Sequence, residues 1–91
     1  QKRGKQKRIL LELVEFPYAS IFYESPRRLK ATLKNIQEVF GNRQTIVVKE
    51  MTKIHEKIYR GRIEEILENF PEHEIKGEFT IVVEGKDKNT I

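Results

Sequence analysis

The strongest constraint on the fold is an apolar stripe of helical spacing that lies between two short apolar runs. The stripe consists of Leu29, Leu33, Ile36 and Phe40. Its spacing predicts a helix with one buried face. Ser25 is a candidate N-cap, Pro26 suits the first helical position, and Gly41 marks the end. This helix anchors the prediction for the rest of the chain.

The flanking runs, "YASIFY" (residues 18–23) and "TIVVKE" (residues 45–50), have the length and composition of strands buried on both faces. Two such strands joined through a helix predict a right-handed parallel βαβ unit. Similar patterns predict further helices at residues 5–15 and 63–70 and strands at residues 57–61 and 78–85. We therefore expect an α/β fold of order αβαββαβ, with helices packed on a mixed, mostly parallel sheet of about four strands.

The composition favours a single small domain without a disulfide framework. The 91 residues include no cysteine, two histidines and one methionine, Met51. The absence of cysteine fits a reducing cytoplasm, and no apolar run approaches the roughly 20 residues of a membrane-spanning helix. Because the chain starts at Gln1, we interpret it as a piece of a longer protein. We expect a basic arm at residues 1–8, a lobe at residues 9–85 and a tail at residues 86–91.

The positive charge is concentrated at the N-terminus. Five of the 18 basic residues lie in the first eight positions, which contain no acidic residue, and the remainder of the chain is nearly balanced. Such an arm suits a phosphate backbone or another anionic surface. The alternative is a solvated, frayed terminus. The five residues are Lys2, Arg3, Lys5, Lys7 and Arg8.

The stretch "FYESPRR" (residues 22–28) carries the clearest candidate site. Ligands of open α/β sheets gather where strands end, and the helix start after Tyr23 offers free backbone amides. Arg27 and Arg28 stand in the first helical turn, where the helix dipole disfavours cations. A bound phosphate or carboxylate would relieve this placement. Alternatively, Glu24 pairs with one of the arginines.

A second polar stretch, "KEMTKIHEK" (residues 49–57), follows the next predicted strand and is a candidate site loop. His55 and His73 lack partners at metal-ligand spacing and are interpreted as loop histidines. The sequence has no Walker loop, no GxGxxG motif and no Ser/His/Asp set in a nucleophile elbow. A cofactor of nucleotide type would therefore need most of its pocket from elsewhere.

Four ordered motifs carry a family resemblance: "FYESPRRL", "EVFG", "KEMTKIHEKIYRG" and "GEFTIVVEG". Together they resemble the C-terminal half of the small-subunit ribosomal RNA methyltransferases of the tetrapyrrole methylase-like superfamily. The resemblance implies methylation of a cytidine ribose 2′-hydroxyl in small-subunit ribosomal RNA with S-adenosylmethionine. It also implies a cofactor cleft between two lobes, a homodimer, and an isolated C-terminal lobe without activity.

The resemblance also implies roles for individual residues. Tyr23, Glu24 and Met51 match positions that approach the cofactor, whereas Arg27 stands where the family usually has histidine. No catalytic base is assigned. The alternatives are a lobe of a tetrapyrrole or other small-molecule methylase, and a basic RNA-binding module without chemistry. The candidates for contact with RNA phosphates are Lys2, Arg3, Lys5, Lys7, Arg8, Arg28 and Lys53.

Overall fold

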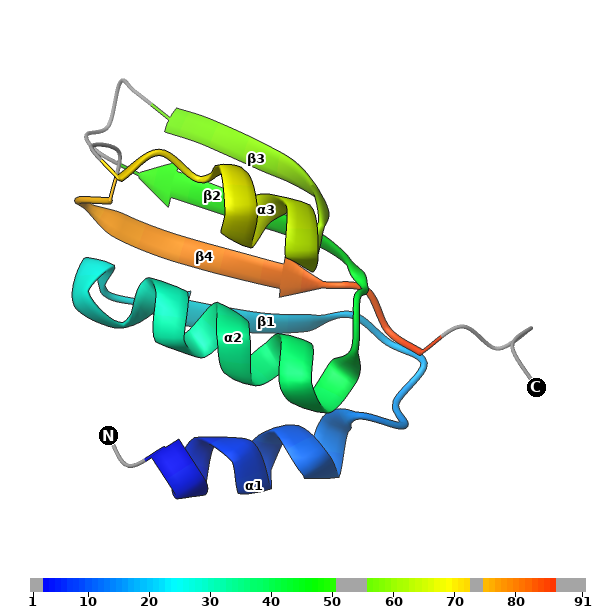
Figure 1. Ribbon diagram of the computed structural model, residues 1–91. Coiled ribbons are helices and arrows are strands. Elements are labelled where there is room, and N and C mark those ends of the chain that lie inside the picture. The colour runs from blue at the N-terminus through cyan, green and yellow to red at the C-terminus, as the bar shows by residue number, and fades with distance from the viewer. Residues whose placement is uncertain (1–2, 51–55, 73–74, 87–91) are drawn as a thin grey trace.

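The computed structural model describes residues 3–50, 56–72 and 75–86 (Figure 1). The elements follow one another in the predicted order, and their bounds differ from the predictions by a few residues. The helix after "FYES" begins with a 3₁₀ turn, η1, before it becomes α-helical. The elements are α1 (Arg3–Leu13), β1 (Ser20–Glu24), η1 (Pro26–Arg28), α2 (Leu29–Phe40), β2 (Gln44–Glu50), β3 (Glu56–Arg62), α3 (Ile63–Asn69) and β4 (Glu78–Val83).

The sheet has the strand order β1-β4-β2-β3, and every pair of neighbouring strands is antiparallel. The prediction of a mostly parallel sheet is therefore wrong. Strands β1 and β2 do run in the same direction, because both are antiparallel to β4, but β4 lies between them. Periodicity identifies each strand, but it does not reveal which strands become neighbours. Strand β4 follows the other described strands in the chain but lies in the middle of the sheet. No local sequence pattern predicts this position.

Helices α2 and α3 lie over one face of the sheet, and α1 lies alongside α2 at the β1 side (Figure 1). Alternate residues of β2 and β4 point into this layer, as the period of a half-buried strand requires. Strand β1 is an edge strand with Ile21 and Tyr23 exposed, so the prediction that it is buried on both faces is wrong. The buried core consists of Leu10, Leu29, Leu33, Ile36, Phe40, Val47, Ile63, Ile66, Phe70, Phe79, Ile81 and Val83.

Arg43 joins several chain segments at the end of the sheet opposite Glu24. Its guanidinium donates hydrogen bonds to the carbonyl oxygens of Val14 (2.7 Å) and Glu84 (3.3 Å). The same group lies 4.6 Å from the centre of the Phe40 ring. The backbone carbonyl oxygen of Arg43 accepts a hydrogen bond from the backbone N–H of Ile63, the first residue of α3. One side chain thereby connects the segment after α1, the end of α2 and the end of β4.

Gly85 permits a close crossing of two backbone segments. A Cβ atom at this position would lie 2.3 Å from the carbonyl carbon and oxygen of Pro17 and 2.6 Å from the Tyr18 nitrogen. Next to it, the backbone N–H of Lys86 donates a 2.8 Å hydrogen bond to the Phe16 carbonyl. The strand β4 can therefore leave the sheet beneath the linker from α1 to β1 only because residue 85 has no side chain.

We predict that Gly85→Ala lowers the free energy of unfolding by about 3 kcal/mol, since backbone atoms cannot yield as a flexible side chain does. Gly4→Ala is the matched control: no atom lies within 4 Å of its added Cβ, and alanine favours the helix. Urea denaturation monitored by circular dichroism measures both. Equal stabilities of the two variants would contradict this account of the crossing.

The ion pair between Glu15 and Lys86 predicts a pH dependence. The hydrogen bond and charge of Lys86 lower the pKa of the exposed Glu15 carboxyl below its ordinary value. A lowered folded-state pKa contributes stability at pH values above the unfolded pKa, and this contribution is lost as the pH falls through the folded value. We expect Lys86→Ala to raise the pKa of Glu15 in an NMR titration, whereas Lys76→Ala leaves it unchanged.

Candidate functional site

The predicted site lies at the end of the sheet where strands β1 and β2 finish. Glu24 and Lys49 both pair with Phe79 of β4, from its two sides. The two strand ends therefore lie at the same edge, but two strand spacings, about 10 Å, separate them. The parallel βαβ unit predicted from the sequence would make these strand ends direct neighbours, and this prediction is wrong, because β4 occupies the position between them.

Tyr23 and Glu24 project from opposite faces of β1. Tyr23 is 79% exposed on the face without helices, whereas the Glu24 side chain is 11% exposed on the face covered by α2. Successive residues of a strand alternate in this way. A single ligand can meet both residues only around the end of the strand or through the main chain.

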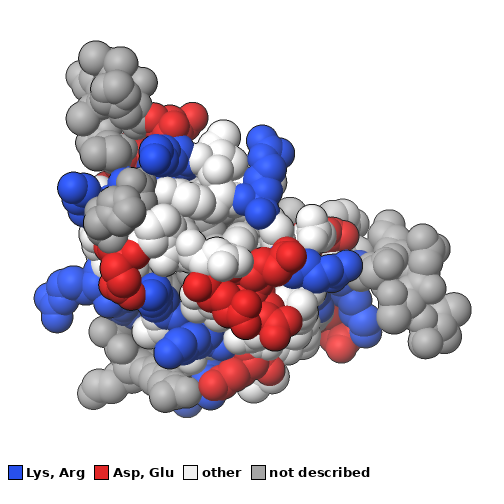
Figure 2. Space-filling view, turned by 45° about the horizontal axis from the view of Figure 1, so that its top comes forward, with Lys and Arg blue, Asp and Glu red and all other residues white. Residues whose placement is uncertain are grey.

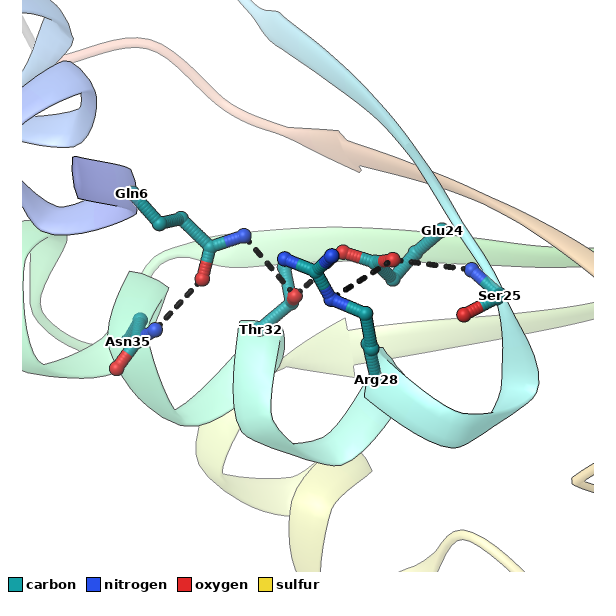
Figure 3. Close-up of polar contacts among 6 residues, drawn as sticks. All are labelled: Gln6, Glu24, Ser25, Arg28, Thr32 and Asn35. Atoms are coloured by element: carbon teal, nitrogen blue, oxygen red, sulfur yellow. Dashed lines mark hydrogen bonds and ion pairs between the residues drawn. The ribbon is translucent and has the colours of Figure 1, made fainter. Parts of the chain in front are cut away.

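Glu24 ends a chain of hydrogen bonds that connects β1, α2 and α1 (Figure 3). Its Oε2 accepts a 2.6 Å bond from the Thr32 hydroxyl, which in turn accepts a 3.1 Å bond from the Gln6 amide. The Gln6 carbonyl oxygen accepts a 2.6 Å bond from the Asn35 amide. The backbone N–H of Ser25 donates to Glu24 Oε1 at 3.0 Å. Protein donors therefore hold both carboxylate oxygens.

This network explains why polar side chains stand on the buried face of α2. Thr32 and Asn35 are nearly inaccessible to solvent, and buried polar groups need hydrogen-bond partners. The bonds to Gln6 fix α1 against α2 in one position. Gln6, Thr32 and Asn35 were not predicted as members of the site. One feature of the sequence could have indicated their role. Thr32 and Asn35 lie next to the apolar stripe and are uncharged, whereas a helix surface that faces solvent favours charged residues.

The two arginines of "ESPRR" have different surroundings. The Arg28 Nε atom lies 3.8 Å from Glu24 Oε1, so the alternative that Glu24 pairs with one arginine holds for Arg28 (Figure 3). Arg27 is exposed, and within residues 3–50, 56–72 and 75–86 no carboxylate forms an ion pair with it. Ser25 occupies the predicted N-cap position, but its side chain makes no capping bond.

A hollow of about 540 Å³ lies between the start of α2 and α1. Arg27, Arg28 and Lys34 give it three cationic groups, and no carboxylate lines it. In Figure 2 a group of Lys and Arg side chains occupies the lower left, the side on which α1 and η1 begin in Figure 1. An anion fits the charge of this hollow. Its remaining lining residues are Gln6, Ala31, Thr32 and Asn35.

The other predicted contact residues have varied positions. Lys5 and Arg8 are exposed on α1, whereas Lys7 forms an ion pair with Glu38 of α2. Arg3 begins α1. The remaining candidates, and both histidines, lie outside the described residues: Lys2, Met51, Lys53, His55 and His73.

The described part of the chain has neither a metal-binding cluster nor a membrane-spanning helix. It contains no group of three or more His, Cys, Asp or Glu side chains arranged to hold a metal ion. None of its helices is long and apolar enough to cross a membrane.

Comparison with known proteins gives consistent relatives, although no family model matches. The chain is 40% identical over 86 residues to the ribosomal RNA small subunit methyltransferase I of Thermotoga maritima. It is 41% identical over 91 residues to the protein of the same name from Bacillus subtilis, and 44% identical over 85 residues to that from Halalkalibacterium halodurans. This chain is homologous to a C-terminal part of ribosomal RNA small subunit methyltransferase I.

The matches cover nearly all of this chain but less than half of each relative. They span 93%, 100% and 92% of the chain and 39%, 31% and 29% of the respective methyltransferase I proteins. The resemblance of the four sequence motifs to the C-terminal part of small-subunit ribosomal RNA methyltransferases is thereby confirmed. The relatives are named as methyltransferases, and the chain corresponds to about a third of such a protein.

We predict that Thr32→Val lowers the free energy of unfolding by about 1–3 kcal/mol, because it removes the acceptor of the partly buried Gln6 side-chain N–H and the hydroxyl donor to Glu24 Oε2. Thr80→Val makes the same change on the helix-free face of β4 and should alter stability by less than about 0.5 kcal/mol. Urea denaturation compares the two. A cost at Thr80 equal to that at Thr32 would contradict the structural role of the network.

Proposed function

We propose that this chain is the C-terminal lobe of a cytoplasmic, homodimeric methyltransferase that transfers a methyl group from S-adenosylmethionine to a cytidine ribose 2′-hydroxyl of small-subunit ribosomal RNA. The lobe, residues 9–85, supplies one wall of the cofactor cleft and part of the RNA surface. The basic residues of the first eight positions add to this RNA surface, and from Arg3 onward they belong to helix α1. The similarity to proteins named ribosomal RNA small subunit methyltransferase I supports this proposal.

The cationic hollow beside α2 is the main structural support for the proposed RNA contact. Arg27 and Lys34 line it without a carboxylate partner in the described structure, and Arg28 also lines it, with its Nε atom 3.8 Å from Glu24 Oε1. Guanidinium and ammonium groups bind phosphate oxygens, and such contacts position a nucleic acid without reading its sequence. The exposed Lys5 and Arg8 extend the basic surface along α1. Lys7 contributes less, since Glu38 already neutralises it.

The edge of the sheet at Tyr23 fits one wall of a cofactor site. An exposed aromatic ring suits contact with an adenine or ribose group. Glu24 contributes through its main chain, because Ser25 and Thr32 engage its carboxylate oxygens. Met51 directly follows Glu50, the last residue of β2, in the sequence.

The residues of this lobe position the reactants and leave the chemistry to the cofactor. Bound S-adenosylmethionine supplies an electrophilic methyl group for in-line attack by the ribose hydroxyl. Phosphate contacts around Arg27 and Lys34 hold the RNA so that the hydroxyl is correctly oriented. The Glu24 carboxylate serves the fold, and we assign no base for removal of the hydroxyl proton.

The RNA contact is tested by fluorescence anisotropy of this chain with a labelled fragment of small-subunit ribosomal RNA. We expect Lys34→Ala and Arg27→Ala each to weaken binding and to reduce the slope of log affinity against log salt by about 1. Lys76→Ala, an exposed lysine distant in sequence from the hollow, is the matched control for Lys34→Ala. Equal losses for Lys34→Ala and Lys76→Ala would contradict a localised RNA contact.

The division of the cofactor site between two lobes predicts that the isolated chain binds S-adenosylmethionine weakly or undetectably. Isothermal titration calorimetry measures this directly. Micromolar affinity would show that the pocket lies within these 91 residues, and the proposed single wall would be wrong.

A further inference from the structure

The chain of hydrogen bonds beside the cationic hollow has a fixed direction. An ionised carboxylate accepts hydrogen bonds and donates none, so the Thr32 hydroxyl must donate its proton to Glu24 Oε2. The Thr32 oxygen then accepts the bond from the Gln6 amide nitrogen. The Gln6 amide oxygen consequently faces Asn35, which must present its own amide nitrogen to it. The Glu24 carboxylate therefore sets the orientation of the Asn35 amide at the far end of the chain.

The side-chain oxygen of Asn35, Oδ1, is the free end of this chain. In Figure 3 it points away from Gln6, and within the described residues it accepts no hydrogen bond. Asn35 is only 4% exposed. Every fully buried side-chain nitrogen or oxygen atom of the described structure has a hydrogen-bond partner, so the unpaired Oδ1 must keep contact with solvent. Since Asn35 lines the cationic hollow, this contact is made through the hollow.

The hollow thus combines cationic groups with one oriented acceptor. Arg27 and Lys34 supply the positive charge, and Asn35 Oδ1 calls for a hydrogen-bond donor. A ribonucleotide backbone offers both partners, because each anionic phosphate is linked to a ribose whose 2′-hydroxyl can donate. The volume of about 540 Å³ lies within the range of small-ligand sites. None of the described residues that line the hollow is aromatic, so it lacks the platform on which unpaired bases stack.

We propose that Asn35 Oδ1 accepts a hydrogen bond from a ribose 2′-hydroxyl in the hollow, and that this contact makes the lobe distinguish RNA from DNA. Arg27 and Lys34 hold the adjoining phosphate. The inference rests on the RNA contact proposed above and adds a specificity-determining residue to it. A deoxyribose would displace solvent from Oδ1 without supplying a donor, and an acceptor left unpaired in this way costs binding affinity.

Fluorescence anisotropy with three single-stranded oligonucleotides tests the role of the hydroxyl. They share one base sequence without uracil or thymine and contain ribose, 2′-fluororibose or deoxyribose. Their phosphates are identical, and the fluoro form keeps an RNA-like sugar geometry but has no 2′ donor. We expect the 91-residue chain to bind the ribose form about tenfold more tightly than either of the others. Equal affinity for all three would overturn the inference and leave Oδ1 as a solvated group.

Asn35→Leu tests the acceptor itself, since leucine has a similar branched shape and no polar atom. We expect this variant to bind the three oligonucleotides equally, with the salt dependence of the phosphate contacts retained. Asn69→Leu is the matched control, because Asn69 is exposed at the end of α3 and does not line the hollow. It should keep the preference for ribose. Circular dichroism establishes folding, and the oligonucleotide comparison decides the question if Asn35→Leu does not fold.

Lys34→Ala separates this inference from the RNA proposal on which it rests. The substitution removes a phosphate contact, so it should weaken binding of all three oligonucleotides by a similar factor and leave the preference for ribose unchanged. If it weakens all three but ribose gives no advantage, the inference fails and the proposed RNA contact stands. If the ribose advantage depends on Asn35 but Lys34→Ala has no effect, the hydroxyl contact stands and the phosphate contact at Lys34 fails.

Discussion

The fold depends on the insertion of β4 between β1 and β2. This strand is hydrogen-bonded along both edges, and its buried residues Phe79, Ile81 and Val83 form the centre of the core. Because β4 is antiparallel to both neighbours, the ends of β1 and β2 are held at one edge of the sheet but two strand spacings apart. The geometry of the candidate site therefore depends on a strand that contributes no candidate residue to it.

Side-chain contacts then fix the elements that surround this sheet. At one end Arg43 connects the segment after α1, the end of α2 and the end of β4. At the other end the network from Asn35 to Glu24 fixes α1 on α2. Helix α1 is thus held at both of its ends, and its basic residues extend from the cationic hollow in a defined direction. The proposed RNA surface is ordered by polar contacts as much as by apolar packing.

The sequence predicts the individual helices and strands of this protein better than it predicts which of them lie side by side. The stripe from Leu29 to Phe40 and the apolar runs give the order of helices and strands, because these patterns arise from residues close together in the chain. The antiparallel sheet was missed, because pairing of β4 with β1 joins residues about 60 positions apart, as in the pair Ser20 and Val83. The "ESPRR" motif located the candidate site, and Glu24 was correctly considered as a partner for an arginine. Gln6, Thr32 and Asn35 were missed, since their role requires α1 and α2 to be in contact.

The position of β4 also has a consequence for the order in which the molecule can assemble. Strand β1 has β4 as its sheet neighbour in the described structure, and β4 follows all the other described strands in the chain. Until residue 83 has emerged from the ribosome, β1 and the helix that follows it lack the strand that joins them to β2 and β3. Contacts of such long sequence separation slow folding. The described part of the chain therefore acquires its complete core only after β4 has been synthesised.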